Sequence, residues 1–417
     1  MKIFPFENPG FSCETGILEL YQFPLIVLQI KHVGRGWFYQ LCWGKTFNFY
    51  KPAPKCGAFM GKRYYVKIVW FENPGFLEKP GFLSYMVVAV RYTSLTHPTF
   101  RIFMTVITYS PAYTLVPTYE CFNRCAYCNF RAEPGQSPWL TLKEIDQILK
   151  TLQNKGICEI LILSGEVHPR SSMRSLWFQR IYDLCKLALS MGFLPHTNAG
   201  PLSYEEMAQL KKVNVSMGLM LEQLTPKLLQ TVHRHAPSKL PEVRLQQLEW
   251  AGELGIPFTT GLLLGIGETQ PDCWESLEAI ARIHQRWGHI QEGILQPYSP
   301  GERHIWDAPG FDLLQLPEII ATARKILPAD ITIQIPPNLV QDENWLLACL
   351  AAGARDLGGI GPKDEVNPDY PHPEYQKLQE ILQPAGWKLM PRLPVYPQYD
   401  EWLSVELQAS VKRWRMG

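Results

Sequence analysis

The regular alternation of strand-like and helix-like segments after Met104 places the strongest constraint on the fold. Short β-rich runs alternate with amphipathic helical runs about eight times within residues 104–417. Repeated strand–helix units of this kind build a parallel sheet with helical crossovers. We expect strands at residues 113–116, 159–163, 194–197, 215–219, 258–264, 293–295, 332–335 and around Leu357.

Local signals place the helices between these strands. Thr141 is followed by Glu144, and Ser203 by Glu206, and both pairs have the spacing of a capping box at a helix start. Glycines that end helical stretches are Gly156, Gly192 and Gly255. Unusual polar residues follow each strand, where a barrel gathers its site at one rim. We therefore predict an α/β fold, a parallel (β/α) TIM-type barrel of eight strands, with an open doubly wound sheet as the alternative.

The first quarter of the chain differs from the rest. Residues 1–103 hold 12 lysines and arginines against five glutamates and no aspartate, and 23 of the chain's 50 aromatic residues. The hexapeptide FENPGF occurs at 6–11 and again at 71–76, without a surrounding repeat period. Three interpretations are open for 1–103: an accessory domain, a disordered extension, or upstream sequence translated ahead of a start at Met104. We favour the third, with the barrel formed by 104–417.

Composition excludes several classes of protein. With 46% hydrophobic residues, 19% charged residues and a net charge of +1, the chain has the balance of a globular protein and lacks the basic excess of a nucleic-acid or anionic-membrane binder. The apolar runs 23–30 and 86–90 stop at Lys31 and Arg91, far short of the ~20 residues that cross a bilayer. The N-terminus lacks a signal-peptide layout, so we expect a cytoplasmic protein.

Three cysteines stand in one tight run, at Cys121, Cys125 and Cys128. Their CxxxCxxC spacing suits an iron–sulfur cluster with one iron left without a protein ligand, where a substrate or cofactor can bind. A closed structural zinc site wants four ligands, usually from a second cysteine or histidine pair, and no such pair follows here. A zinc knuckle completed by a distant histidine and a chance cluster among ten cysteines are the alternatives.

Small and polar residues follow the expected strands in a consistent order. Ser164, Gly165 and Glu166 follow the second strand, Asn198 the third and Glu222 the fourth. The fifth carries Gly261, Gly265 and Glu268, a glycine spacing that permits flat packing of an adenine ring. A lone glycine-rich stretch is weak evidence, because glycines commonly serve only turns.

The cysteine run followed by these segments resembles the radical S-adenosylmethionine superfamily. That resemblance implies that Cys121, Cys125 and Cys128 hold one [4Fe–4S] cluster per chain, whose open iron chelates the methionine end of S-adenosylmethionine. Ser164 replaces the first glycine of the family's GGE-like segment, and Leu263 replaces the isoleucine of its GxIxGxxE-like segment. The other cysteines are interpreted as buried, unreactive thiols.

Longer segments narrow the resemblance. Residues 195–200 (PHTNAG), 233–239 (HRHAPSK) and 358–362 (GGIGP), among others within about 104–375, resemble the radical subunit of the deazaflavin chromophore synthase family. Residues 296–300 and 361–364 depart from the expected forms. The resemblance implies ring closure of a hydroxybenzyl–ribitylimino–dihydrouracil adduct with loss of ammonia. It also implies a sister radical subunit that makes this adduct from tyrosine, and a low-potential electron donor such as ferredoxin or flavodoxin.

The resemblance and the residue chemistry together imply the following roles. Tyr127 packs beside the cluster, Glu166 accepts the cofactor's amino group, Asn198 bonds its carboxylate or ribose, and Glu222 bonds a ribose hydroxyl. An uncharged polyhydroxyl substrate needs neutral donors and acceptors rather than an arginine clamp. Candidates for its uracil edge, phenol and ribityl hydroxyls are His196, His233, His235, Gln296, Asn338 and Asp364.

Two alternatives remain at the level of sequence. A sibling radical enzyme of the biotin-synthase or menaquinone-pathway type would share the cysteines and the first cofactor segments, but segments 233–239 and 358–367 favour the deazaflavin family. A non-catalytic iron–sulfur electron carrier would have no use for the cofactor glycines and carboxylates. Failure of the reduced protein to cleave S-adenosylmethionine would favour the electron carrier.

Overall fold

The structure is a computed structural model that describes residues 105–416 in full. Before them it describes only the backbone of five short strands, so our interpretation of 1–103 lies outside the described residues. These strands are β1 (Gly16–Leu18), β2 (Leu28–Ile30), β3 (Tyr65–Val69), β4 (Met86–Arg91) and β5 (Thr99–Phe100). Strands β1 and β2 pair antiparallel, as do β3, β4 and β5 in order. Contacts divide the chain into two units, Met1–Met104 and Thr105–Gly417.

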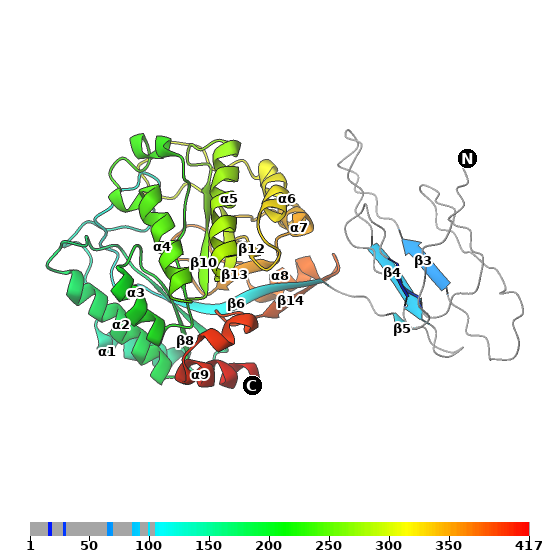
Figure 1. Cartoon of the computed structure of the whole chain (residues 1–417), viewed down its shortest axis with the longest axis horizontal. Coiled ribbons are helices and arrows are strands. Elements are labelled where there is room, and N and C mark those ends of the chain that lie inside the picture. Colours follow the sequence, from blue (N-terminus) through cyan, green and yellow to red (C-terminus); the bar gives the residue numbers. More distant parts are fainter. Residues whose placement is uncertain are drawn as a thin grey trace, which may run out of the picture. The chain divides into compact units, whose positions relative to one another are not determined.

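Eight parallel strands close into a barrel in the second unit, as predicted (Figure 1). Each strand pairs in parallel with the next along the chain, and β13 pairs with β6 to complete the ring. The barrel strands are β6 (Thr105–Leu115), β7 (Glu159–Leu163), β8 (Leu194–Asn198), β9 (Ser216–Gly218), β10 (Phe258–Leu264), β11 (Ile290–Pro297), β12 (Thr332–Gln334) and β13 (Asp356–Ile360). Every expected strand is present.

Strand β6 is much longer than the sequence indicated. Its second half pairs with β7, while its first half, from Thr105 to Tyr109, pairs in parallel with a further strand, β14 (Trp387–Pro391). The sequence reading did not identify β14. It follows α8 and lies beyond the eight strands that the expected barrel required.

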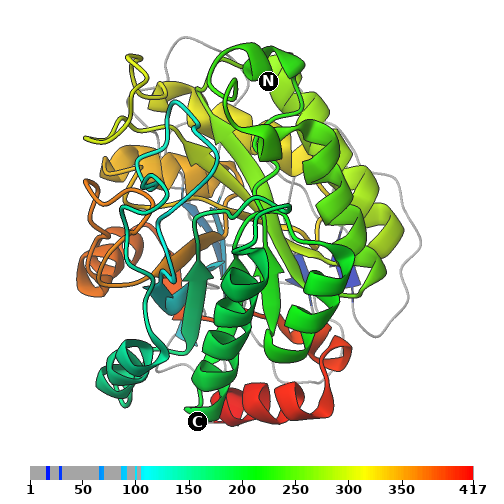
Figure 2. The same ribbon diagram turned by 90° about the vertical axis from the view of Figure 1, so that its left-hand side faces the viewer.

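Helices cover the outside of the barrel (Figures 1 and 2). They are α1 (Leu142–Leu152), α2 (Arg174–Ser190), α3 (Tyr204–Leu210), α4 (Pro241–Glu253), α5 (Gln270–Trp287), α6 (Leu316–Ile326), α7 (Glu343–Ala352), α8 (Tyr375–Leu382) and α9 (Val405–Met416). Both expected capping boxes are present, at Thr141 and Ser203. The glycines expected to end helical stretches have the left-handed φ values that favour glycine, 74° at Gly156, 92° at Gly192 and 61° at Gly255. Among the helices described, none is both long and apolar enough to span a membrane.

The C-terminal segment closes the amino-terminal end of the barrel. In Figure 2 helix α9, in red, lies across the bottom of the molecule beneath the surrounding helices. A separate apolar cluster joins this segment to Leu194, the first residue of β8, and to Val215, just before β9. Its buried members are Leu194, Val215, Val395, Tyr399, Leu403, Leu407 and Val411. The opposite end, where the strands' carboxyl termini meet, is left to loops.

Candidate active site

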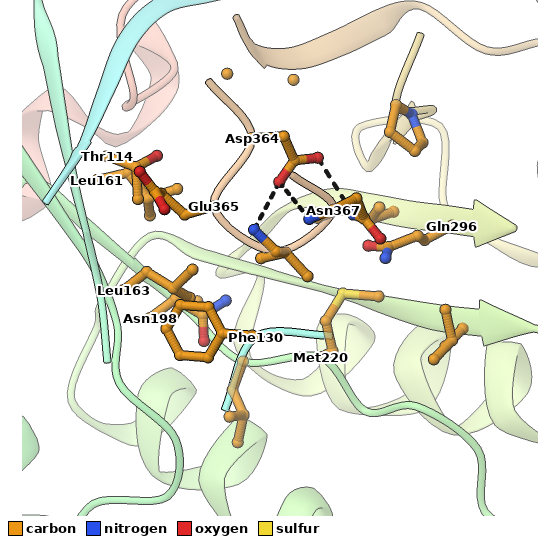
Figure 3. A pocket seen from close by; sticks show the side chains of 18 of the residues that line it. Thr114, Phe130, Leu161, Leu163, Asn198, Met220, Gln296, Asp364, Glu365 and Asn367 are labelled. Atoms are coloured by element: carbon orange, nitrogen blue, oxygen red, sulfur yellow. Dashed lines mark hydrogen bonds between the residues drawn. The ribbon is translucent and has the colours of Figure 1, made fainter. Parts of the chain in front are cut away.

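A cavity of about 360 Å³ occupies the interior of the barrel (Figure 3). All eight barrel strands contribute to its wall, from Thr114 on β6 to Leu357 on β13. The barrel interior of a TIM-type fold is usually filled by layers of packed side chains. Here the cavity extends from the cysteines at the carboxyl ends of the strands down to Glu159, the first residue of β7. The interior therefore has room for a ligand.

The loop that carries the three cysteines is held by backbone hydrogen bonds to two other segments. Phe122 N donates to Glu166 O at 3.0 Å, Arg124 N to His235 O at 2.8 Å and Ala126 N to Val232 O at 2.9 Å. Cys121, Cys125 and Cys128 all line the cavity. The fold therefore presents three thiols of one loop to the same space, supported by the segments after β7 and β9.

The thiols have the chemistry of cluster ligands. Burial raises the pKa of Cys121 to about 11 and that of Cys125 to about 12, so both keep their protons near pH 7 until a metal displaces them. Soft thiolate ligands suit iron–sulfur clusters and zinc. No three histidine, cysteine, aspartate or glutamate side chains converge as they would on a single metal ion, within the residues described. The remaining described thiols, Cys158, Cys185, Cys273 and Cys349, are buried.

Glu166 lies beside the cysteines in a network of donors. Its carboxylate accepts from Asn123 Nδ2 at 2.9 Å and from Arg244 Nη2 at 3.4 Å. Asn123 Nδ2 also lies 3.7 Å from Cys121 Sγ. Gly200 leaves the space that Glu166 occupies, because a Cβ atom there would lie 2.4 Å from Glu166 Cγ. The sequence reading missed Asn123, although it stands inside the cysteine run, and also Arg244.

A second carboxylate, Glu222, pairs with Lys239 on the same wall. Burial alone would raise the pKa of Glu222, but Lys239 and Arg244 outweigh burial and leave this pKa below its usual value. Glu222 has a φ of 67°, a left-handed conformation that a residue with a side chain rarely adopts. Two carboxylates and two cations beside the thiols complement a ligand with both an ammonium and a carboxylate, as the methionine end of S-adenosylmethionine has. The residues present therefore fit this cofactor.

Most of the predicted site residues come together at this cavity. Those that line it are Cys121, Cys125, Tyr127, Cys128, Ser164, Gly165, Glu166, His196, Asn198, Glu222, Gln296, Asn338 and Asp364. Tyr127 is held by a 2.9 Å hydrogen bond between its hydroxyl and His233 Nε2. The side chain of His196 bonds Ser216 Oγ through Nδ1 at 2.7 Å, and burial lowers its pKa to about 3, which keeps the ring neutral.

Five predicted residues lie outside the cavity lining. His233 contacts the Tyr127 hydroxyl and does not line the cavity, and the backbone carbonyl of His235 accepts a hydrogen bond from the cysteine loop. Glu268 turns back to accept from its own loop, at Gly265 N (2.5 Å) and Ile266 N (2.8 Å). At Gly261 a Cβ atom would lie 2.1 Å from the Ile294 carbonyl oxygen, so this glycine allows close approach of β11.

A charged cluster forms the deep end of the cavity. Arg392, just after β14, donates from Nε to Asp356 Oδ2 at 2.6 Å and from Nη2 to Oδ1 at 2.8 Å, and also pairs with Glu292. Burial raises the pKa of Glu292 to about 7, and burial also raises that of nearby Glu159. The sequence reading missed this cluster because its cation comes from the C-terminal segment, which carried no motif.

Comparisons with known proteins agree with the geometry. Residues 115–280 match the family model of the radical SAM superfamily. The chain is 76% identical over 310 residues, 74% of its length and 91% of the relative's, to the 7,8-didemethyl-8-hydroxy-5-deazariboflavin synthase of Trichormus variabilis. It is 65% identical over 311 residues, 75% of its length and 98% of the relative's, to the enzyme of the same name from Trichodesmium erythraeum.

Solved structures share the fold at lower identity. The FeFe-hydrogenase maturase HydG from Carboxydothermus hydrogenoformans superposes with a TM-score of 0.59 at 18% identity, covering 74% of this chain and 77% of that one. Methylornithine synthase has a TM-score of 0.54 at 17% identity, covering 69% and 84%. The high identity to whole relatives, with the radical SAM match, shows that the chain belongs to the 7,8-didemethyl-8-hydroxy-5-deazariboflavin synthase family of the radical SAM superfamily.

Proposed function

We propose that the chain forms 7,8-didemethyl-8-hydroxy-5-deazariboflavin from 5-amino-5-(4-hydroxybenzyl)-6-(D-ribitylimino)-5,6-dihydrouracil. Ammonia, methionine and 5′-deoxyadenosine are the other products, so the reaction is that of a carbon–nitrogen lyase. The 76% identity to a named synthase over 91% of that relative carries this proposal. The interior cavity, whose lining on the β12–β13 side includes the neutral polar side chains of Gln334, Asn338, Asn367 and His372, supports it.

Cys121, Cys125 and Cys128 are the proposed ligands of a [4Fe–4S] cluster. Their common loop and their place on one cavity wall support this role. When bound, the cluster and S-adenosylmethionine supply the 5′-deoxyadenosyl radical that starts the reaction by removing a hydrogen atom from the substrate. The chain's own contribution is to bind and orient the reactants and to keep water away from them.

The charged pairs beside the thiols have a binding role in this proposal. Glu166 accepts the ammonium group of the cofactor's methionine end, and the neighbouring cations Arg244 and Lys239 attract its carboxylate. Glu222 and Asn198 accept and donate hydrogen bonds to the ribose. Tyr127, partly buried and fixed by His233, forms an apolar support for the same ligand.

The reaction requires other proteins. A sister radical subunit supplies the hydroxybenzyl–uracil adduct, and a low-potential donor, ferredoxin or flavodoxin, supplies the electron. We place the protein in the cytoplasm, where thiols stay reduced.

Anaerobic turnover tests the proposal. The full chain, reconstituted with iron and sulfide and reduced with dithionite, is given S-adenosylmethionine and the adduct, and products are identified by mass spectrometry and deazaflavin fluorescence. We expect 5′-deoxyadenosine and the deazaflavin together. Cys125→Ala removes both products, whereas the matched control Cys349→Ala, a buried thiol on α7, retains them. Deoxyadenosine without deazaflavin would refute the substrate, and neither product from a protein with an intact cluster would favour an electron carrier.

A further inference from the structure

A polar wall on the β12–β13 side of the cavity has hydrogen-bonding capacity that the protein itself does not use. We use "polar wall" for Asn338, Asp364, Asn367 and His372, all of which line the cavity. Asn338 follows β12, and the other three lie in the loop after β13. Figure 3 shows Asp364 and Asn367 joined by a hydrogen bond on this side of the cavity.

The side-chain amide of Asn338 has a fixed orientation. Its Nδ2 donates to Asp364 Oδ2 at 2.8 Å and to the Tyr370 carbonyl oxygen at 3.0 Å. A carboxylate and a carbonyl oxygen only accept, so the nitrogen must face them and Oδ1 must face away. The residue is 0% exposed, and its Oδ1 has no hydrogen-bond partner in the described part of the chain. A buried acceptor without a partner is destabilising, which points to a donor supplied by a ligand.

His372 adds a second unused polar atom to the same wall. Its Nδ1 is buried and without a partner among the residues that the structure describes. Burial lowers the pKa of His372, against an opposing effect of Asp364, so the ring is neutral near pH 7. A neutral imidazole offers one donor and one acceptor. Both His372 and Asn338 line the cavity, and the loop that carries His372 contacts Asn338 through the carbonyl oxygen of Tyr370.

Asp364 has a different part in the wall. Besides Asn338, it accepts from Asn367 Nδ2 at 3.2 Å and from the backbone N–H groups of Val366 (2.8 Å) and Asn367 (3.0 Å). Four donors occupy its two oxygens, so it has little capacity left for a ligand. Its effect is to hold the Asn338 amide and the loop after β13 in place.

We infer that Asn338 Oδ1 accepts a hydrogen bond from a ring N–H of the substrate's dihydrouracil, that His372 meets the neighbouring ring carbonyl, and that Asp364 is the positioning residue. This inference rests on the proposed function. A cyclic ureide presents a donor next to an acceptor in one rigid plane, which matches a fixed acceptor and a neutral imidazole that line the same cavity. The substrate also carries donors outside the ring, in its ribityl hydroxyls, its phenol and its amino group, and an analogue altered only at a ring N–H separates the ring from all of them.

The test combines one variant with two substrate analogues. The reconstituted full chain is titrated with the adduct, with an analogue methylated at the ring nitrogen between the two carbonyl carbons, and with an analogue whose ribityl group is replaced by butyl. For the unaltered protein, methylation should raise Kd about 10- to 100-fold, because one hydrogen bond is lost and the acceptor stays buried. Asn338→Ala should bind the adduct itself about 10- to 100-fold more weakly than the unaltered protein does. Methylation should then change the Kd of this variant by less than about threefold.

Two further variants keep the test decisive. Asp364→Asn keeps the shape of the cavity but allows the Asn338 amide to turn. It should reduce the rise in Kd that methylation causes, and it should change KM more than kcat. Asn344→Ala, an exposed asparagine on α7, is the matched control and should retain the full effect. If Asn338→Ala fails to fold by circular dichroism, Asp364→Asn carries the test.

The outcomes separate the inference from the proposed function. The inference would be overturned if methylation raised Kd by the same factor in the unaltered protein and in Asn338→Ala. It would also be overturned if Asn338→Ala no longer distinguished the adduct from the butyl analogue but still distinguished it from the methylated one. Failure of the unaltered protein to bind or convert the adduct would instead overturn the proposed function, and the inference with it.

Discussion

Arg392 neutralises a buried group of carboxylates, and its removal should cost much of the protein's stability. It forms two short hydrogen bonds to Asp356, which is 0% exposed, and an ion pair with Glu292, which is 3% exposed. Glu159, 6% exposed, lies close to both. Arg392→Met keeps most of the side-chain volume but leaves three buried carboxyls without their cation. Breaking a buried ion pair in this way costs about 3–5 kcal/mol of the free energy of unfolding.

The free energy of unfolding that Arg392→Met loses should increase with pH. The pKa of Glu292 is raised from 4.5 to about 7, so between these values the folded protein holds a proton that the unfolded chain has released. Stability therefore falls as pH rises through that window, by about 3 kcal/mol for a shift of this size. Without Arg392 the carboxyl pKa values rise further, and the window extends above pH 7. The difference in free energy of unfolding between the unaltered protein and Arg392→Met should be larger at pH 8.5 than at pH 5.5.

Urea unfolding followed by far-ultraviolet circular dichroism at both pH values measures this difference. The control is Arg282→Met, which breaks an exposed i,i+4 pair with Glu278 and should cost less than about 1 kcal/mol at either pH. Equal midpoints for Arg392→Met and the unaltered protein, or a loss that is larger at pH 5.5, would refute the electrostatic account.

Three further changes test other parts of the site. Cys125→Ala should abolish the visible absorbance of the reconstituted cluster, and an unchanged spectrum would remove this thiol from the ligand set. Gly200→Ala should weaken binding of S-adenosylmethionine about tenfold or more, measured by calorimetry, because the added methyl group displaces Glu166 and φ is +81° at this position. A chain that begins at Thr105 should retain the cluster and turnover if the barrel is the catalytic unit; an insoluble or inactive product would contradict that boundary.

Local sequence signals were sufficient for the barrel but not for its closure at the amino-terminal end. Capping boxes and terminal glycines act within a few residues, so Thr141 and Ser203 marked helix starts correctly. Strand β14 pairs with β6, which lies nearly 300 residues earlier in the chain. This pairing depends on tertiary contacts, which a local sequence pattern cannot predict.

The same distinction applies to the site. The cysteines and Glu166 stand in short motifs, so the sequence alone made them candidates, and all four line the cavity. Arg244 lies on α4, where no sequence motif marks it, yet its guanidinium contacts Glu166, 78 positions earlier in the chain. Arg392 is equally remote from the strands that it neutralises. Such partners become visible only when the fold has brought them together.

The position of Arg392 after all eight barrel strands has a consequence for synthesis on the ribosome. A nascent chain that has reached Ala352 already contains the cysteine loop and seven of the eight barrel strands, and Asp356 follows a few residues later. Its interior carboxyls have no cation until residue 392 leaves the exit tunnel. Stable folding of the barrel interior is therefore coupled to synthesis of the segment that carries Arg392, and a chain terminated before that segment would be exposed to proteolysis.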